Sequence, residues 1–389
     1  MKIIPFRNHG CGSLSFRAAL AVLGAVAIAF ETHAADGSAG AYGFTGIGSV
    51  PYGGPPGSEA YGISADGSTI VGQSGGQAFY WKRSTGIVGL GNGAPYGDLM
   101  VAYGVSGDGS VIVGSIAQAT NNQAFRWTGS TGVVPLGYLP GQWSSSAEAV
   151  SSDGNTVVGY SQGTRSGNAF IWTTSGGMAN VNPALAQSAA YAVSDDGKTI
   201  VGTVSSGPFR WTSAGGVTRF GAGSDLVAGI SGDGSTVVGC RVYVSYVGGS
   251  YQVTQQAYSW NASQGMVFLG YLPGTLQMSC ALDASGDGST IVGWADSGSG
   301  YKAAIWDAAH GWRDLNQVLA SAGVDLVGWD LTSAMAISND GQIITGSGTD
   351  PNGNTEGWVV TLVPEPASLG FLSSLLALAV AWKRRCERR

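Results

Sequence analysis

A nine-residue pattern, Ser-x-Asp-Gly-x-x-φ-φ-Gly with φ aliphatic, recurs along this chain and constrains its fold more than any other feature. The first copy occupies residues 64–72, and the last copy, residues 338–346, has Thr345 in place of the second aliphatic residue. Self-similarity of this kind is the sign of an array of structural repeats, so the copies are counted before any domains. The seven copies place their aspartates at Asp66, Asp108, Asp153, Asp196, Asp233, Asp287 and Asp340.

Each copy predicts a β-hairpin, because Asp-Gly between two β-prone runs is a strong turn signal. A third run, such as residues 78–81, ends in Trp, and a fourth run, such as residues 87–91, follows a Gly-containing turn. Each repeat therefore predicts four short strands. Calcium loops gather several oxygen ligands in one loop, whereas each turn here has one Asp apart from Asp195-Asp196. We therefore interpret the seven aspartates as turn formers and expect neither a metal site nor a cofactor.

The two ends of the repeat array complement each other. No fourth run follows Trp358, the seventh Trp, while an unpaired run of the fourth type at residues 44–48 precedes the first repeat. The aspartates lie about 46 residues apart on average, within the span of roughly 40–50 residues for four-stranded propeller blades. The sequence thus predicts an all-β fold, a seven-bladed β-propeller of four-stranded blades closed by pairing of the N- and C-terminal strands. Ring closure leaves only short, protected edges.

Both termini look like sorting elements. Residues 1–35 have a basic start, an apolar run at 18–30 and small residues at 32–35, which predicts a helical secretory signal peptide, with a retained anchor as the alternative. At the other end, Pro364-Glu365-Pro366 precedes the mostly apolar residues 367–382 and a basic tail. A short span followed by such a tail predicts a transmembrane helix that stops with the tail in the cytoplasm. Residues 36–363 are the exported part.

Residues 364–389 resemble the PEP-CTERM sorting signal of Gram-negative bacteria, with its motif on Pro364, Glu365 and Pro366. This resemblance implies processing by exosortase, a membrane-embedded cysteine-type enzyme, and export through the inner membrane to the cell surface or beyond. The C-terminal helix would anchor the chain in the membrane until processing. Residues 42–362 also resemble the HAF repeats of extracellular bacterial proteins, on Ala124-Phe125-Arg126-Trp127 and the Tyr-Leu-Pro-Gly segments at 138–141 and 271–274. That family brings no settled activity.

The exported part is acidic and contains two cysteines. Its ten basic and 21 acidic residues give a net charge of −11. Such a surface repels nucleic-acid phosphates and anionic lipid headgroups, so we expect no nucleic-acid partner. Cys240 and Cys280 end and begin strands in neighbouring repeats, and an even pair in an oxidising compartment can bridge. Two buried thiols are the alternative.

Loops on one face of the predicted propeller are the candidate recognition surface. The Asp-Gly turns share one face, so the connections between repeats and the insertion at residues 241–256 lie on the other. Varied loops on a rigid scaffold often carry function. Aromatic side chains there can stack on sugar rings, or they can simply cover loop ends. The candidate aromatic residues are Tyr138, Trp143, Tyr243, Tyr246 and Tyr271.

No catalytic constellation stands out in the sequence. A nucleophilic triad needs a base, and the exported part has one histidine, His310, in a predicted turn. A glycosidase needs two carboxylates, but nothing in the spacing pairs Glu59, Asp98 and Glu148, which fall on or near the loop face. We therefore expect a surface or matrix binding module, with exopolysaccharide as the ligand class, and not an enzyme. The alternatives are a glycan-active hydrolase or lyase, marked by paired buried carboxylates, and a purely structural surface protein.

Overall fold

The computed structural model describes residues 42–51, 56–91, 99–118, 120–164, 167–274 and 278–362. These residues belong to one compact unit, Tyr42–Leu362. The expected signal peptide and the sorting signal with Pro364, Glu365 and Pro366 lie outside the described residues. Within the described ranges, no helix has the length and apolar character needed to cross a bilayer.

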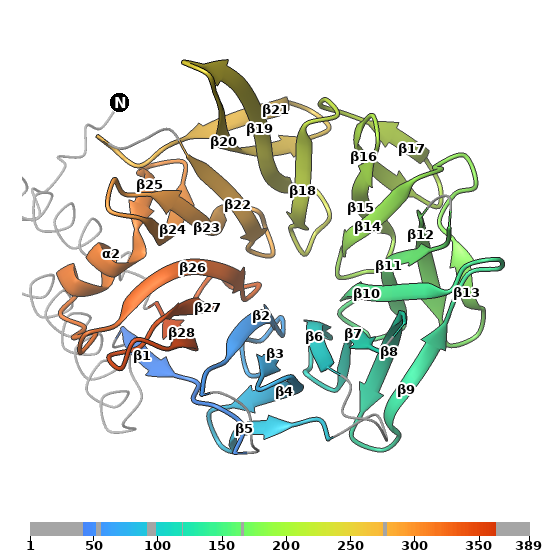
Figure 1. Cartoon of the computed structure of the whole chain (residues 1–389), viewed down its shortest axis with the longest axis horizontal. Coiled ribbons are helices and arrows are strands. Elements are labelled where there is room, and N and C mark those ends of the chain that lie inside the picture. The colour runs from blue at the N-terminus through green and yellow to red at the C-terminus, as the bar shows by residue number, and fades with distance from the viewer. Residues whose placement is uncertain are drawn as a thin grey trace, which may run out of the picture. The chain divides into compact units, whose positions relative to one another are not determined.

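Seven four-stranded antiparallel sheets surround a central axis, which confirms the predicted seven-bladed propeller (Figure 1). We number the blades in chain order and give their strands from the axis outward. The strands are β2 (Glu59–Ile63), β3 (Ile70–Ser74), β4 (Gln77–Lys82) and β5 (Gly86–Gly89) in blade 1, β6 (Leu99–Val105), β7 (Val111–Ala117), β8 (Asn122–Thr128) and β9 (Gly132–Gly137) in blade 2, β10 (Ser144–Val150), β11 (Thr156–Gln162), β12 (Gly167–Thr173) and β13 (Gly177–Asn180) in blade 3, β14 (Ser188–Val193), β15 (Thr199–Val204), β16 (Gly207–Thr212) and β17 (Gly216–Arg219) in blade 4, β18 (Asp225–Ile230), β19 (Val237–Val247), β20 (Ser250–Asn261) and β21 (Gly265–Gly270) in blade 5, β22 (Ser279–Ala284), β23 (Thr290–Asp296), β24 (Tyr301–Asp307) and β25 (Gly311–Asp314) in blade 6, and β26 (Asp330–Ile337), β27 (Ile343–Thr349), β28 (Thr355–Thr361) and β1 (Gly43–Gly46) in blade 7.

The ring closes through the first and last strands of the propeller. Strand β1 pairs antiparallel with β28, with Phe44 opposite Val360. The outermost strand of blade 7 therefore comes from the start of the propeller, as the unpaired run in the sequence predicted. Phe44 also packs edge-on against Trp329, with ring centroids 5.1 Å apart.

The repeated motif builds the same turn in every blade. In blade 2, the buried Ser106 hydroxyl donates to Asp108 Oδ1 over 2.8 Å and accepts from the Val111 N–H over 2.9 Å. Asp108 Oδ1 also accepts from the Ser110 N–H. Equivalent bonds occur in the other six copies. Backbone and hydroxyl donors satisfy the carboxylate, so this turn forms without an ion.

The Gly that closes the motif is required by a bulge in the innermost strand. At each such strand the pairing register shifts by one residue. A Cβ added at Gly114 would lie 1.9 Å from the Val101 carbonyl oxygen, and the closing glycines of the other blades would meet the same clash at 1.9–2.0 Å. The bulge beside the closing Gly leaves one extra residue per innermost strand, and β26 has a second bulge near its start. These residues are Tyr61, Tyr103, Glu148, Tyr191, Ala228, Leu282 and Met335.

One aromatic assignment from the sequence was wrong. Trp358 was expected to match the Trp residues that end the third strands of the other repeats. Instead it pairs with Gly346, as Phe125 pairs with Gly114, and Val360 takes the Trp position. Trp358 is therefore fully buried at the position that Phe125 holds in blade 2.

The insertion at residues 241–256 lies where the sequence placed it, and a second segment, residues 317–330, also interrupts the regular blades. The first lengthens β19 and β20 into a long hairpin that turns at Gly248-Gly249. The second includes most of helix α2 (Leu315–Ser321), whose N-cap Asp314 accepts a hydrogen bond from the Asn316 N–H. Leu315 and Leu319 bury one side of this short helix against blades 6 and 7.

Candidate functional site

The five candidate loop aromatics fall into two separate groups. Between blades 2 and 3, Asn121 Nδ2 donates to the Tyr138 hydroxyl over 2.8 Å and to the Trp143 carbonyl over 2.9 Å. Tyr243 and Tyr246 lie on the long hairpin of blade 5, and Tyr271 follows β21 of that blade. The two groups belong to different sectors of the ring.

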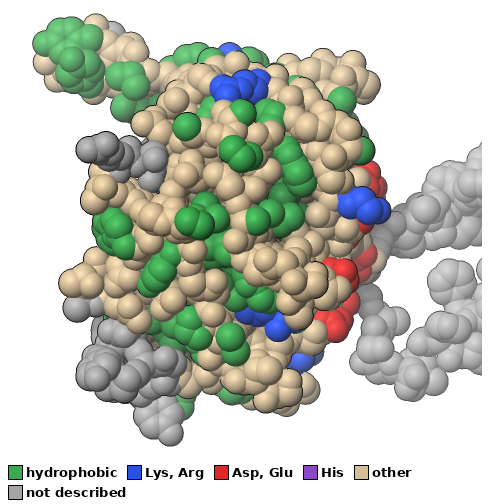
Figure 2. Space-filling view, turned by 90° about the vertical axis from the view of Figure 1, so that its right-hand side faces the viewer, with side chains coloured by type: hydrophobic (Ala, Val, Ile, Leu, Met, Phe, Trp, Pro, Cys, Tyr) green, Lys and Arg blue, Asp and Glu red, His purple; other side chains and the backbone are tan. Residues whose placement is uncertain are grey.

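The long hairpin carries an exposed apolar lobe. Figure 2 shows this lobe projecting near the top of the molecule, with acidic side chains gathered at the opposite edge. Tyr246 and Tyr251 make an edge-on ring contact across the hairpin, with centroids 5.0 Å apart. The exposed apolar residues of the lobe are Tyr243, Val244, Tyr246, Tyr251 and Val253.

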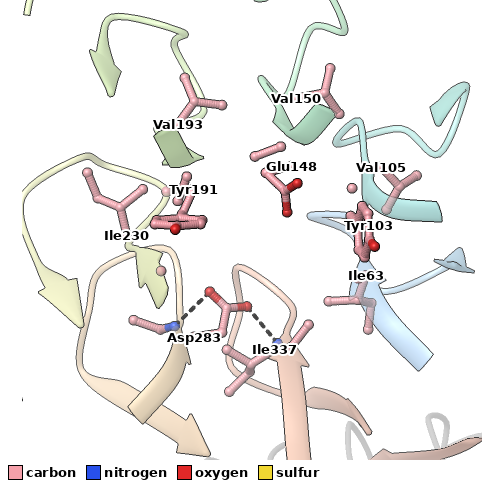
Figure 3. Close-up of a pocket in the computed structure, with 18 of the residues that line it drawn as sticks. Ile63, Tyr103, Val105, Glu148, Val150, Tyr191, Val193, Ile230, Asp283 and Ile337 are labelled. Carbon is pink, nitrogen blue, oxygen red and sulfur yellow. Dashed lines mark hydrogen bonds between the residues drawn. The ribbon is translucent and has the colours of Figure 1, made fainter. Parts of the chain in front are cut away.

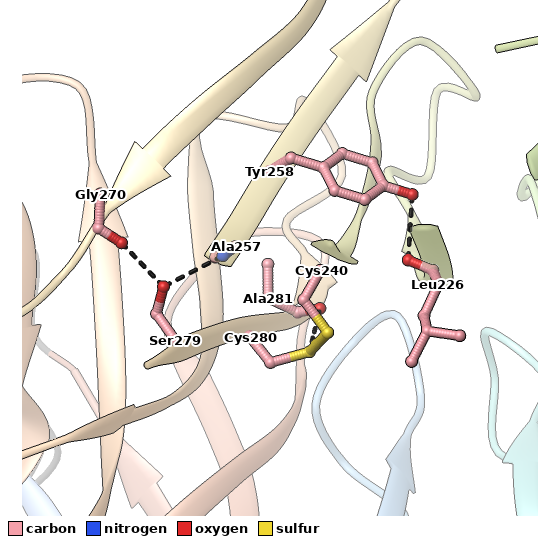
Figure 4. The surroundings of a disulfide bond; sticks show 8 residues. All are labelled: Leu226, Cys240, Ala257, Tyr258, Gly270, Ser279, Cys280 and Ala281. Atoms are coloured by element: carbon pink, nitrogen blue, oxygen red, sulfur yellow. Dashed lines mark hydrogen bonds between the residues drawn. A yellow bond between two sulfur atoms is a disulfide. The ribbon is translucent and has the colours of Figure 1, made fainter. Parts of the chain in front are cut away.

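A disulfide ties the base of this hairpin to the next blade. Cys240 of β19 and Cys280 of β22 are bonded, with Cα atoms 4.9 Å apart (Figure 4). Beside it, the Ser279 hydroxyl donates to the Gly270 carbonyl and accepts from the Ala257 N–H. The covalent bond and these hydrogen bonds together fix blade 5 against blade 6.

The candidate site is a cavity in the central channel, away from the loop aromatics. It has a volume of about 470 Å³ and is lined by the innermost strands β2, β6, β10, β14, β18, β22 and β26. The extra residue of each bulge beside the closing Gly belongs to this lining. Blades 1 to 4 contribute Tyr61, Tyr103, Glu148 and Tyr191, whereas blades 5 to 7 contribute the apolar Ala228, Leu282 and Met335.

Two carboxyl groups face one another across the channel. Figure 3 shows Glu148 and Asp283 pointing inward from opposite walls, with Tyr103 and Tyr191 on the two sides between them. Ser146 Oγ donates to Glu148 Oε1 over 2.6 Å. Asp283 accepts from the N–H groups of Ala284 and, in the next blade, Ile337, over 2.9 and 3.0 Å. Both carboxyl residues are half-buried and keep partial access to the channel.

Burial raises the pKa of both carboxyl groups. Desolvation raises the pKa of Asp283 to about 7, although two backbone hydrogen bonds oppose the rise. Desolvation also raises the pKa of Glu148, against the hydrogen bond from Ser146. Near neutral pH Asp283 therefore exchanges readily between its charged and neutral forms, as a group in acid–base chemistry must.

The tyrosines on one side of the cavity are held in place by contacts with each other and with a carboxylate. The Tyr61 and Tyr103 rings lie 5.8 Å apart and are tilted. The Tyr61 hydroxyl donates to the Glu59 carboxylate. Burial raises the pKa of both hydroxyls, with the nearby Glu59 adding to the rise at Tyr61, so both stay protonated at physiological pH.

Contacts at the turn end of the channel draw the blades together. The residue before each motif Asp joins a belt of backbone hydrogen bonds that crosses six of the seven blade junctions. Within the belt, Asn339 Nδ2 of blade 7 donates to the Asp195 carboxylate of blade 4. This bond reaches across the axis and narrows the channel at that end.

The lining carries charge of one sign. Glu148, Asp195 and Asp283 line the cavity, and no Lys, Arg or His does so among the described residues. Over the same part of the chain, no three His, Cys, Asp or Glu side chains are placed to hold a metal ion. His310 contacts Asp307 in the exposed β24–β25 turn, and Asp98 lies outside the described residues.

Sequence reasoning missed most of this site. Glu148 was noted near the loop face, yet it lines the channel, and the three tyrosines and Asp283 were not singled out. The position of these residues relative to the motif could have identified them. Each bulge residue stands three places before the motif Ser, and Asp283 stands two places before Ser285, where the other repeats have Gly or Ala.

Fold and site together define a seven-bladed β-propeller with an acidic, tyrosine-lined channel. Neither a protein-family model nor a curated protein matches the chain. Solved structures do match its fold. An oligogalacturonate lyase in complex with manganese is 14% identical with a TM-score of 0.51, over 78% of this chain and 88% of that one. The oligogalacturonate lyase of Vibrio parahaemolyticus is 13% identical with a TM-score of 0.51, over 82% and 97%.

A third similar structure is the β-propeller domain of the Trilobed protease from Pyrococcus furiosus. It is 11% identical with a TM-score of 0.50, over 78% of this chain and 93% of that one. That domain is described as having an open velcro topology. Here, in contrast, β1 closes the ring on β28.

Proposed function

We propose that this protein is an exported surface or matrix protein whose propeller binds a glycan in its central channel. The observation that carries this proposal is the wall formed by Tyr61, Tyr103, Glu148 and Tyr191 facing Asp283. Aromatic faces with a few convergent polar groups suit a sugar, which has both apolar faces and hydroxyls. Sorting by exosortase at Pro364-Glu365-Pro366 and an extracellular glycan partner form part of the same proposal.

The two oligogalacturonate lyases share the propeller fold with this chain, so a fold of this kind can accommodate a glycan. An oligogalacturonate is a chain of acidic sugars, and the described lining of this channel holds three carboxyl groups and no basic residue. Like charges in such a cavity repel, so the charge pattern disfavours a uronate ligand. The ligand we propose is therefore a glycan without acidic groups.

Glycan hydrolysis is a second candidate, and the facing carboxyl groups favour it. Glycosidases use one protonated carboxyl to protonate the leaving oxygen and one carboxylate as nucleophile or base. Glu148 and Asp283 lie on opposite walls with raised pKa values. In this role Asp283 or Glu148 would supply the proton, and the other would act in its ionised form.

A combined binding and turnover experiment tests both candidates. The full chain is screened on a glycan array, and bound glycans are then tested for cleavage, with Glu148→Gln and Asp283→Asn as variants. Binding without cleavage is the expected result for a binding module. Cleavage abolished by either substitution, but unchanged by Asp325→Asn in the exposed loop after α2, would instead establish the hydrolase. Failure to bind any glycan would overturn both candidates.

A further inference from the structure

The charge of the channel lining restricts what can enter it. Each of the three carboxyl residues of the lining comes from a different blade: Glu148 from blade 3, Asp195 from blade 4 and Asp283 from blade 6. Among the described lining residues no cation balances them. A narrow cavity with charge of one sign concentrates ligands of the opposite sign.

The carboxyl groups retain capacity to bind such a ligand. An ionised carboxylate has about four acceptor positions. From the described residues, the Glu148 carboxylate receives one hydrogen bond, from Ser146. The Asp283 carboxyl receives two, from Ala284 and Ile337. The remaining positions on both groups are free to accept from a ligand in the channel.

The tyrosines on the two flanks suit the same ligand. Tyr103 and Tyr191 lie on the two sides between the facing carboxyl groups (Figure 3). Aromatic faces attract cations within about 6 Å of the ring. A cationic group on the axis would therefore have carboxylates on two sides and tyrosines on the other two.

The repeat architecture does not explain the carboxyl group of Asp283. At the position of Asp283 the other blades have Gly62, Gly104, Ala149, Ala192, Gly229 and Ala336. Space is tight at several of these positions, since a Cβ on Gly62 would lie 2.6 Å from the Tyr103 carbonyl oxygen. Asp283 is thus an exception to a rule that favours small residues, and it extends a carboxyl group toward the axis.

We propose that the channel selects a glycan unit that carries a free, protonated amine, that is, an amino sugar that is not N-acylated. This inference rests on the proposed glycan-binding function and specifies its ligand class. The ammonium lies between Glu148 and Asp283, and the sugar ring packs against Tyr103, Tyr191 and the apolar wall of blades 5 to 7. The apolar wall consists of Ala228, Leu282 and Met335.

Titration calorimetry of the full chain with two matched probes tests the inference. The probes are the glucosamine tetramer, which has free amines, and the N-acetylglucosamine tetramer, which has none. At pH 7 and low salt, where the Asp283 carboxyl is partly ionised, we expect the amine tetramer to bind at least roughly tenfold more tightly, because its ammonium group is attracted to the facing carboxylates. Added salt should reduce that preference.

Variants assign the effect to the channel. Glu148→Gln keeps an acceptor for Ser146 but removes the charge, so it should weaken binding of the amine tetramer by roughly tenfold and change binding of the acetylated tetramer by less than about twofold. Asp325→Asn, the same chemical change in an exposed loop, should alter neither affinity. Melting temperatures of all variants identify any loss that comes from misfolding, and Asp283→Asn provides a second charge deletion.

Each outcome decides the inference. The amine assignment would be overturned, with glycan binding retained, if the two tetramers bound equally or the acetylated one bound more tightly. It would also be overturned if the Glu148→Gln variant bound the glucosamine tetramer as tightly as the parent protein does. A tetralysine peptide that binds as tightly as the glucosamine tetramer would show that the sugar ring is not recognised and would overturn the inference. Binding of neither tetramer would overturn it too, and the glycan array then shows whether the broader function fails with it.

Discussion

Blades 1 to 4 and blades 5 to 7 share one backbone design but present different side chains to the channel. In every blade the innermost strand has a bulge opposite the closing Gly of the motif. The extra residue is Tyr or Glu in the first four blades and Ala, Leu or Met in the last three. The channel therefore has a polar, aromatic half and an apolar half.

This difference separates the structural part of the repeat from its functional part. The motif residues that recur seven times, such as Ser106 and Asp108, satisfy one another and build the turn. The residues that differ between blades, such as Glu148 and Asp283, carry the unusual chemistry. In a propeller of this kind, a residue that breaks the repeat is a better guide to function than one that obeys it.

The largest expected effect tests the shared backbone. Gly114→Ala in the polar half and Gly239→Ala in the apolar half should each destabilise the fold by about 3 kcal/mol, because overpacking against a fixed backbone forces strands apart. Both glycines face a carbonyl oxygen 1.9 Å from the added Cβ. Urea denaturation measures the change.

Gly129→Ala is the matched control, since an added Cβ there has no heavy atom within 4 Å. It should leave the free energy of unfolding within about 0.5 kcal/mol of the parent. A large loss at Gly114 with none at Gly239 would show that the two halves do not share one bulge-and-glycine design.

The next effect isolates Asp283, the carboxyl group in the apolar half. Its pKa rises from 3.8 to about 7 on folding, so the folded state holds the proton more tightly than the unfolded state. Its contribution to stability is therefore full at low pH and is lost as pH rises from about 4 to about 7. We expect a loss of about 2 kcal/mol, allowing for partial exposure to the channel.

Asp283→Ala, which copies blades 3, 4 and 7, should flatten this part of the pH profile of the unfolding free energy. The turn aspartates act in the opposite sense, because hydrogen bonds lower the pKa of residues such as Asp108 and Asp153, and their contribution is lost only as pH falls below about 4. An unchanged slope between pH 4 and pH 7 in Asp283→Ala would contradict the assignment.

The fold was largely predictable from the sequence, whereas the channel was not. Hairpins, blade number and ring closure follow from local turn chemistry and from the unpaired run near Phe44. The bulge follows from strand register, which a repeat pattern does not display. Without the bulge, Tyr61 and Tyr103 look like ordinary strand residues, and Glu148 could be placed near a face but not on the axis.

The smallest expected effect compares the two halves as binding surfaces. Tyr191→Ala should weaken binding of the glucosamine tetramer by roughly fivefold, since a cation near an aromatic face gains about 1 kcal/mol. Met335→Ala, which truncates the bulge residue of blade 7, should weaken it by less than about twofold, because it removes only apolar contact and no charged or aromatic group. Tyr191→Phe keeps the ring and should retain most of the affinity, which separates the ring face from the hydroxyl. If Met335→Ala instead weakened binding as much as Tyr191→Ala, the ligand would contact both halves equally. The two halves would then differ in composition but not in their contribution to ligand binding.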